Sequence, residues 1–403
     1  MGQTLTNADE ALKEFYLPTI REQINQDIKA VQLFERNSTD IEGRRAILSV
    51  HLTRNSGVGA RSEGADLPTA GNQGYGEERI PVFYQYGRLQ VTGPVIKAMK
   101  SDKGSFTRAV ESESKGLVND VKRDENRQIW GTSDGVIATC GTTSASTTLT
   151  LAATTTATQM RQFHRGQRIS TGTKAEFEAG TATDVTITSI DAAAKTMVIS
   201  AAVTTDSSDF VSVWGASGTT QREITGIRTI VDSTGALHNL NPSTEIEWAA
   251  YEASNSGTNR APTDDLFEQA ADEIYLAGGE YPDLLFTSHG VRRAYANQLK
   301  AQKRFSNTVE LKGGFSAVSV DLPDGKPLAL VAERDCPDNS AFLINSAHMT
   351  FFEESDWEFM DDDGAVLSRV SNKDAYEATL YKYRELATDK RNAHGKILDL
   401  TNS

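Results

Sequence analysis

The 403-residue chain contains side chains that could do catalytic chemistry, but their spacing fits no reaction. Ser288 and His289 could supply a nucleophile and a base. Adjacent residues rarely orient productively, however, and Ser288 fits better as the N-cap of a helix. The carboxylate pairs Asp264–Asp265 and Glu353–Glu354 point apart on a helix or a strand, so neither pair can share a proton. We therefore expect no enzyme. The alternative, a hydrolase built on residues 262–345, lacks a credible base.

Metal and cofactor sites have no matching pattern either. The six histidines and two cysteines are scattered, without HExxH or paired Cys/His spacing. The Asp-Asp-Asp-Gly run at 361–364 lacks the spaced ligands and closing glutamate of a calcium loop, which favours a solvated turn. Residues 57–59 and 74–76 are Gly-x-Gly pairs without the third glycine of a dinucleotide-binding loop, and both are interpreted as flexible loop. We expect no metal and no cofactor.

The composition describes a foldable but acidic chain. Hydrophobic residues make up 38% and charged residues 24% of the sequence, and the net charge is −14. This charge argues against a protein whose main task is to grip nucleic acid, because phosphate neutralisation needs clustered Lys and Arg. No run approaches the roughly 18 apolar residues of a membrane span, and the start of the chain lacks an apolar signal segment. Cys140 and Cys336 give no disulfide framework, which fits a reducing cytoplasm.

A polar excursion and a long helix dominate the first third of the chain. A strand-like run at 46–53 leads into a Gly/Asn/Ser-rich stretch. Residues 80–86 return with apolar side chains on alternate positions, so a very long β-hairpin is predicted at about 54–90. A helix pattern without proline runs from Lys103 to Trp130, about 40 Å at roughly 1.5 Å per residue. A polar hairpin of this length needs a neighbouring subunit to hold it, which indicates an assembly protein.

The remaining segments differ in composition. Residues 132–220 are Thr-rich, with short strand patterns between Gly, Asp and Ser turns, and predict a small inserted all-β barrel or sandwich. Residues 262–345 alternate helices and strands, with Thr263 capping the first helix, as in an α/β module. Strand patterns close the chain after His348. Two short helices are predicted within 7–31, and they either pack on their own chain or reach a neighbour.

Taken in order, these parts resemble the major capsid proteins of tailed bacteriophages with the Hong Kong 97-like fold. The resemblance rests on order and spacing rather than on one decisive motif. Its parts are the arm to about Leu52, the hairpin at 54–90, YGRLQVTG at 86–93 before the helix at 103–130, GGEYPDLLFTSHGVRRAY at 278–295 with Gly313-Gly314 following, and DAYEATLYKYRELATDKRNAHGKILDL at 374–400.

The resemblance implies an α+β fold divided into the family's domains. These would be an N-terminal arm (1–53), an E-loop hairpin (54–92), a peripheral or P domain with the spine helix (93–131), an inserted β-barrel or sandwich domain (132–222), a P-domain connector (223–261), an axial or A domain (262–346) and the C-terminal strands of the P domain (347–403).

The resemblance also implies a function and partners. Copies would assemble into hexamers and pentamers of an icosahedral phage head that encloses double-stranded DNA, made in the host cytoplasm and found in the virion. A separate scaffolding protein, a portal and a decoration protein would be further partners, with no membrane. The acidic charge fits DNA that is enclosed with weak, non-specific contact.

Two sets of contact residues follow from the resemblance. The hairpin charges that would form intersubunit salt bridges, with simple solvation as the open alternative, are Arg54, Arg61, Glu63, Asp66, Glu77, Glu78 and Arg79. The residues that would line the capsomer axis are Gln302, Lys303, Arg304 and Lys312.

The sequence departs from the family in two respects, and two rival functions stay open. No lysine occurs between His51 and Ile96, so an E-loop isopeptide cross-link is not expected. The arm begins almost at Met1, which implies a separate scaffold or an already mature product. The rivals are an encapsulin-type compartment, which shares the fold, and a β-rich adhesin or tail-type binding protein suggested by residues 132–220.

Overall fold

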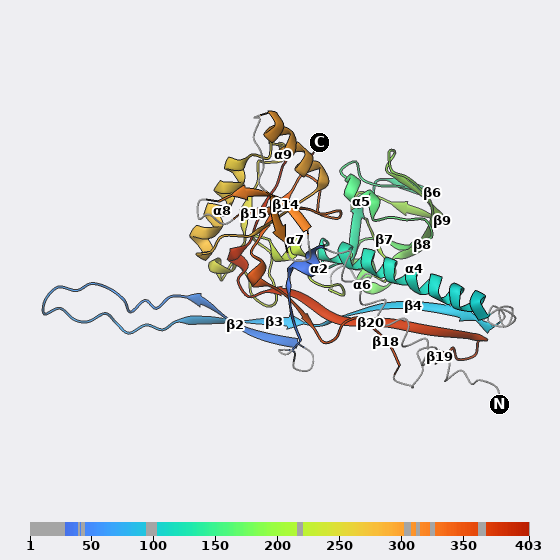
Figure 1. The fold of residues 1–403 in the computed structure, drawn as a ribbon, viewed down its shortest axis with the longest axis horizontal. Coiled ribbons are helices and arrows are strands. Elements are labelled where there is room, and N and C mark those ends of the chain that lie inside the picture. The colour runs from blue at the N-terminus through green and yellow to red at the C-terminus, as the bar shows by residue number, and fades with distance from the viewer. Residues whose placement is uncertain are drawn as a thin grey trace.

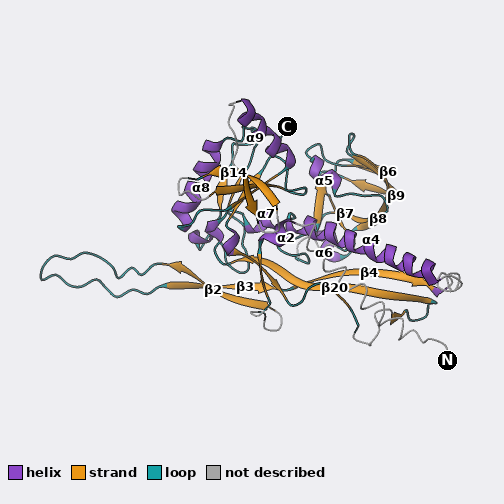
Figure 2. Ribbon diagram, in the orientation of Figure 1, coloured by secondary structure: helices purple, strands orange, loops and turns teal. Residues whose placement is uncertain are grey.

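The computed structural model describes residues 29–38, 41, 45–93, 103–215, 221–301, 308–311, 315–322, 327–361 and 368–402. Over these residues the chain forms three folded bodies and one projecting arm (Figure 1). A long sheet with a long helix over it forms the base. A mixed sheet flanked by helices and a small barrel stand above the base, and the arm extends away from one end of it (Figure 2).

The long sheet is organised on β20 (Ala375–Thr388), a 14-residue strand. Its antiparallel partners are β4 (Phe83–Thr92) on one side and β17 (Met349–Glu353), β18 (Glu358–Phe359) and β19 (Ser368–Arg369) on the other. The short helix α2 (Lys29–Leu33) leads into β1 (Glu35–Asn37), which adds in parallel to β17.

Helix α4 (Lys103–Ile129) lies along one face of this sheet, and the seam between them buries charge as well as apolar surface. Arg384 of β20 forms an ion pair with Glu125 of α4, and both side chains are fully buried. Arg384 also donates to Gln85 of β4 over 3.2 Å, and Gln85 donates to Gln128 of α4 over 2.6 Å. Because an unpaired buried charge is very costly, these contacts fix the helix on the sheet.

The mixed sheet is a seven-stranded layer with helices on one face. Its spatial order is β11 (Tyr251–Ala253), β21 (Gly395–Ile397), β16 (Ala341–Ile344), β12 (Leu284–Thr287), β15 (Pro327–Ala332), β14 (Phe315–Asp321) and β13 (Thr308–Leu311). Helices α8 (Asp264–Gly278) and α9 (His289–Ala301) pack on one face through Phe267, Val291 and Leu285. On the other face Phe286 meets Trp130 from the end of α4, with ring centroids 5.4 Å apart.

Strand alternation and capping explain these elements. Leu285 and Phe286 point to opposite faces of β12, which places both sides of the strand in apolar cores. The Thr263 hydroxyl accepts from the Leu266 N–H at the start of α8, and Gly279, with φ +78°, ends this helix in the left-handed region. The short segments α7 (Ile227–Ile230), η1 (Ile246–Trp248), η2 (Ser346–His348) and η3 (Arg391–Ala393) connect the sheets.

The barrel occupies residues 136–213 of the segment predicted to be all-β. Its strands, in spatial order, are β5 (Val136–Thr139), β10 (Phe210–Val213), β7 (Arg168–Gly172), β8 (Thr183–Asp191), β9 (Thr196–Thr205) and β6 (Thr143–Thr150). A bridge between Cys140 and Leu151, which directly follow β5 and β6, closes the ring. Two short helices, α5 (Ala157–Arg161) and α6 (Lys174–Ala179), complete it, and its apolar core is its own.

Some predicted boundaries are wrong. The closing residues 395–397 were predicted as P-domain strands, but they form β21 inside the mixed sheet, between β11 and β16. The hairpin was predicted to extend to residue 92, but β4 pairs with β20 along its whole length and belongs to the long sheet. The glycines at 74 and 76 were interpreted as loop and instead begin a strand. The helices predicted within 7–31 fall largely outside the described residues.

Candidate assembly site: the arm and its root

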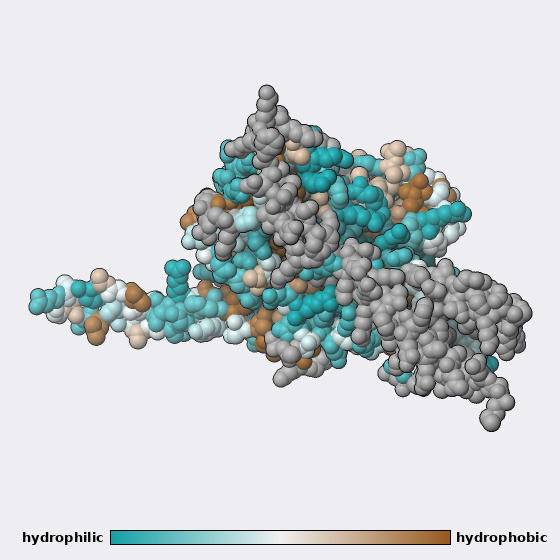
Figure 3. Space-filling view, in the orientation of Figure 1, coloured by the Kyte–Doolittle hydropathy of each residue, from teal (hydrophilic) through white to brown (hydrophobic). Residues whose placement is uncertain are grey.

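The projecting arm, which is the predicted hairpin and not the predicted N-terminal arm, consists of two strands and a long polar loop. Strand β2 (Arg45–Thr53) pairs antiparallel with β3 (Gly74–Pro81), and residues 54–73 between them form no regular structure. The loop stands clear of the three bodies, as Figure 3 shows, with polar atoms interrupted by a few apolar ones. An exposed segment of this length has no core of its own to define its position.

Glycine keeps the two limbs of the loop close together near its base. The Asn55 side chain accepts from the Gly57 N–H over 2.7 Å and turns the chain. A β-carbon at Gly57 would lie 2.7 Å from the backbone nitrogen of Gly71, and one at Gly71 would lie 2.8 Å from that of Gly57. Only glycine permits this approach at both positions, so the loop is narrow where it leaves the strands.

Six of the seven predicted hairpin charges face solvent. They are Arg54, Arg61, Glu63, Asp66, Glu77 and Arg79. In the described part of the chain only Glu77 and Arg79 of these form an ion pair, over 3.0 Å, and the Arg79 guanidinium lowers the pKa of Glu77. Val58 and Leu67 are 85% and 86% exposed among these charges. Most of the arm's charged groups and its apolar side chains are thus free for contact with another molecule.

Glu78 is the exception among the predicted charges. Its side chain is fully buried, and its Oε1 lies 2.7 Å from Nδ1 of His238, which belongs to the same chain. Adjacent residues of a strand face opposite sides, so Glu77 points outward while Glu78 points into the body, on the same face as the buried Ile80. Glu78, predicted to form an intersubunit salt bridge, is therefore bound within its own chain instead.

The contact with His238 extends into a buried polar chain at the root of the arm. His238 Nε2 lies 3.2 Å from the Thr225 hydroxyl, and the Thr225 N–H donates to Glu385 of β20 over 2.6 Å. Burial raises the pKa of Glu385 to about 7, and burial likewise raises the pKa of Glu78. Two carboxyl groups with raised pKa values are therefore linked through one imidazole where the arm meets the body.

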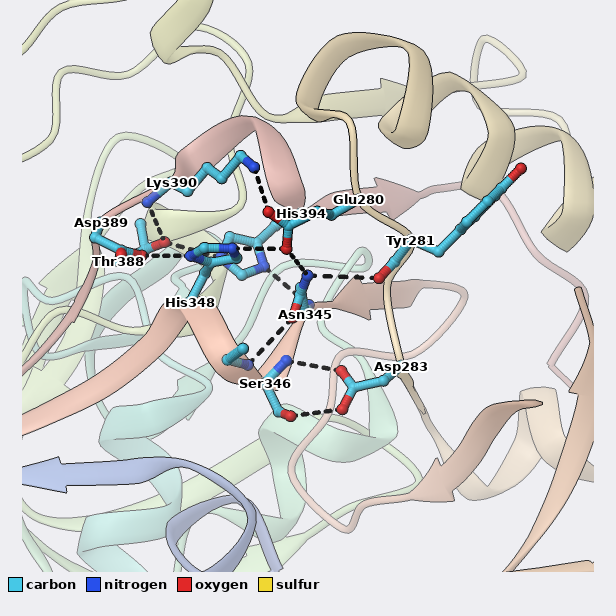
Figure 4. Close-up of polar contacts among 11 residues, drawn as sticks. Glu280, Tyr281, Asp283, Asn345, Ser346, His348, Thr388, Asp389, Lys390 and His394 are labelled. Atoms are coloured by element: carbon cyan, nitrogen blue, oxygen red, sulfur yellow. Dashed lines mark hydrogen bonds and ion pairs between the residues drawn. The ribbon is translucent and has the colours of Figure 1, made fainter. Parts of the chain in front are cut away.

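A second polar cluster lies where the long and mixed sheets are joined (Figure 4). The chain passes between the sheets at the end of β16 and again at the end of β20. His348, after the first passage, lies 2.8 Å from Asp389 at the second and 2.9 Å from Glu280. Lys390 donates to Glu280 over 2.7 Å. These contacts bind the two connections to each other. We call the cluster of residues labelled in Figure 4 the joint.

The joint holds two histidines whose pKa values are shifted in opposite directions. Its hydrogen bond with Asp389, followed by that with Glu280, raises the pKa of His348. His394 is fully buried, and burial lowers its pKa to about 3. The Asn345 N–H donates to His394 Nδ1 over 3.2 Å, so the neutral ring carries its proton on Nε2, which donates to Thr388 over 2.8 Å. Lys390 and His348 lower the pKa of Glu280 to about 2.

Comparison with known proteins identifies the family. Residues 209–401 match the family model described as SU10 major capsid protein. This match covers just under half of the chain and supports a major capsid protein of a tailed bacteriophage. The capsid protein is thus a virion component whose copies form an icosahedral capsid. No curated protein matched its sequence.

One solved structure shows the same fold as the capsid protein. The cyanophage A-1(L) capsid asymmetric unit superimposes with a TM-score of 0.54 at 12% identity, over 93% of this chain and 92% of that one, which supports the Hong Kong 97-like fold. Lower similarity is found to the holo-SrpI encapsulin complex of Synechococcus elongatus PCC 7942, with a TM-score of 0.45, 10% identity and coverage of 92% and 87%. The capsid of Myoviridae phage XM1 gives a TM-score of 0.43 at 11% identity, over 92% of this chain and 91% of that one.

Sequence reasoning missed both the root of the arm, for which a local signal exists, and the joint, for which none does. The alternation from Ile80 places Glu78 on the buried face of its strand, and His238-Asn239 between two leucines is a turn signal. The joint has no local signal, because it unites residues far apart in the sequence. The predicted axis residues Gln302, Lys303, Arg304 and Lys312 lie outside the described residues.

Among the described residues, no helix is long and apolar enough to cross a membrane. Within the same ranges, no three His, Cys, Asp or Glu side chains converge as a metal site would require. Ser288, considered above as a nucleophile, accepts from the Val291 N–H over 3.3 Å, as a helix cap does.

Proposed function

We propose that the capsid protein assembles into hexamers and pentamers by laying its arm, as the family's E-loop, on a neighbouring subunit. The single observation that carries this proposal is the arm itself. It projects from the body, exposes Val58 and Leu67 almost fully, and leaves most of its charges without partners among the described residues. Such a segment gains contacts only from another molecule, and a closed shell supplies one to every copy.

The charges of the arm are proposed as intersubunit ion pairs. Arg54, Arg61, Glu63 and Asp66 are exposed on the loop, and Glu77 and Arg79 lie nearer the body. An exposed ion pair contributes little by itself, but its repetition at every subunit contact fixes the orientation of neighbours.

The shell is proposed to enclose double-stranded DNA without gripping it. A net charge of −14 opposes tight phosphate binding, so the interior would hold DNA through weak, non-specific contact. Assembly is proposed to take place in the host cytoplasm, with a separate scaffolding protein, a portal and a decoration protein as partners. No catalytic activity and no cofactor are part of this proposal.

The deciding experiment removes the loop and leaves its strands intact. Because Gly57 and Gly71 already lie against each other, deletion of residues 58–70 should close the hairpin without moving β2 or β3. We expect a folded subunit, with unchanged circular dichroism and melting temperature, that forms no shells in negative-stain microscopy and light scattering. Closed shells from this deletion would show that the arm is not the assembly contact.

A matched variant separates the length of the arm from its chemistry. Replacement of residues 58–70 by a Gly/Ser segment of equal length keeps the reach of the loop and removes its charges and its two exposed apolar side chains. We expect shells to be lost here as well. Normal shells would mean that the loop acts as a spacer and that its side chains make no required contact.

A further inference from the structure

The root of the arm contains a continuous polar chain that is closed off from solvent. It runs from Glu78 of β3 through His238 and Thr225 to Glu385 of β20, with successive contacts of 2.7, 3.2 and 2.6 Å. Glu78 and Glu385 are fully buried, and Thr225 is 1% exposed. This polar chain thus connects β3, the returning strand of the arm, to β20, the central strand of the long sheet.

A tight turn holds the arm at this point by two contacts. Leu237 and Leu240 bridge each other, and the two residues between them, His238 and Asn239, have φ of +46° and +78°. The turn places the His238 ring on Glu78, while the His238 carbonyl accepts from the Arg79 N–H over 2.9 Å. Left-handed backbone at two consecutive non-glycine residues is strained, so the contacts of the turn must offset that strain.

The charges around this chain leave its carboxyl groups poorly compensated. Oε2 of Glu78 and Oε2 of Glu385 are buried without hydrogen-bond partners. His238 contacts Glu78 directly, and its charge lowers the pKa of both carboxyl groups. Asp389 and Arg391, from the end of β20 and from η3, act on Glu78 with opposite sign. One imidazole therefore serves two carboxyl groups, and full ionisation of both would leave net negative charge in a closed space.

We propose that the chain from Glu78 to Glu385 is a proton-linked latch that holds the root of the arm on the body and opens when its carboxyl groups lose their protons. The protonated latch keeps β3 under the 237–240 turn. When both carboxyl groups ionise, repulsion and the lack of solvation favour exposure of Glu78 and Glu385 to water, which frees β3 from the turn.

The direction of the pH dependence follows from the two carboxyl groups. Burial raises the pKa of Glu385 from its ordinary value near 4.5 to about 7, and it raises the pKa of Glu78. The closed latch therefore binds more protons than the open one. The stabilisation that the bound protons give to the closed latch is fully present below about pH 4.5 and is lost as the pH rises to about 7. For each proton that is released on opening, the equilibrium constant between the closed and the open latch rises by about tenfold per pH unit in this range.

The test is hydrogen exchange of the full-length, unassembled subunit between pH 5 and pH 8. The reporter is the protection factor of the 74–81 strand, and of the Arg79 amide in particular, after correction for the intrinsic exchange rate. We expect protection to fall by about tenfold or more from pH 5 to pH 8. Equal protection at both pH values would overturn the proposal.

Two conservative variants and one control assign the effect. Glu385→Gln and Glu78→Gln keep an amide oxygen in place of the carboxyl oxygen and cannot ionise, so each should reduce the fall in protection. The double variant should abolish it. Glu77→Gln, on the same strand but facing solvent, should keep the wild-type dependence. A double variant with the wild-type dependence would exclude the latch.

A measurement on the wild type covers the case in which the variants do not fold. Infrared spectra should show a protonated carboxyl carbonyl band at pH 5 that disappears towards pH 8, and its absence would overturn the proposal. These measurements use unassembled protein, so their outcome is independent of whether the arm contacts a neighbour. Only the consequence for shells, an arm angle that responds to pH during assembly, rests on the proposed function.

Discussion

The tip of the arm and the seam between α4 and β20 are both rich in charged side chains, but the two regions hold them in opposite environments. At the tip, Arg61 and Asp66 are exposed and form no ion pair among the described residues. In the seam, Arg384 and Glu125 are fully buried and paired. The same residue types are therefore available for a partner in one region and necessary for folding in the other.

The comparison teaches that environment decides what a charge does. A surface charge costs little to leave unpaired because water solvates it, whereas a buried charge without a partner has a large desolvation cost. Charge removal should therefore affect assembly at the tip and stability in the seam. The following experiments test this division, from the largest expected change in the free energy of unfolding to the smallest.

Loss of Arg384 should have the largest effect. Arg384→Met leaves Glu125 buried without its partner, and we expect the free energy of unfolding to fall by about 3–5 kcal/mol. Urea denaturation of the subunit measures this. The double variant Glu125→Leu with Arg384→Met removes both charges and should recover much of the loss. If the single and double variants are equally unstable, packing rather than charge explains the seam.

Protonation of the buried His394 should come next, because it places a charge where none is paired. Burial lowers the pKa of His394 to about 3, so its contribution is present above the ordinary value of 6.5 and is lost as the pH falls towards 3. We expect the free energy of unfolding to fall by on the order of 3 kcal/mol over this range. Thermal unfolding at several pH values measures this loss.

The variant His394→Gln should flatten that dependence, and the neighbouring His348 provides the opposite control. The carboxylates of Asp389 and Glu280 raise the pKa of His348, so its contribution is present below 6.5 and is lost as the pH rises through the raised value. His348→Gln should therefore lower stability at acid to neutral pH, where the contribution of His348 is present, and should change it least above the raised pKa. An equal loss of stability at acid and at alkaline pH would contradict the assignment.

A smaller gain is expected on the solvent side of α4. Gly116 is exposed in the middle of this helix, and a β-carbon there would meet nothing within 4 Å. Gly116→Ala should stabilise the subunit by about 0.5–1 kcal/mol, because alanine has the higher helix propensity. Denaturant unfolding measures the gain, and destabilisation would show that this position needs the freedom of glycine.

Charge reversal at the tip should leave stability unchanged. Glu63→Lys with Asp66→Lys alters only exposed side chains, so we expect an unaltered melting temperature and a strong reduction in shell formation. Microscopy and calorimetry on the same preparation measure both. Normal shells would favour the alternative in which these charges are merely solvated.

The sequence predicts elements with strong local signals well. The Leu-Leu-Phe-Thr run at 284–287 is β12, and Thr263 caps α8 as predicted, because burial and capping act over a few residues. The sequence TSASTTLT of β6 was not predicted, since Leu149 is its only large apolar side chain. The capping boxes at Thr156 and Thr173 are local sequence signals for the starts of α5 and α6.

The assignment of residues to sheets and sites was less predictable, for a physical reason. Residues 395–397 join the mixed sheet through partners that are distant in sequence, which no local pattern specifies. Arg384 could have been recognised as buried, because Leu380, Lys382 and Leu386 share its face of β20 and Leu380 and Leu386 are apolar. Its partner on α4 could not, since that contact depends on how the helix crosses the sheet.

The barrel's first and last strands are neighbours, with Val136 of β5 opposite Ser212 of β10. Just outside them, Gly226 approaches the Gly131 carbonyl so closely that a β-carbon would not fit. The chain therefore leaves the body and returns to it at one place. This geometry makes the barrel a replaceable inserted domain. Another domain whose two ends lie side by side can be inserted between these glycines, and the long sheet, the mixed sheet and the arm keep their own connections.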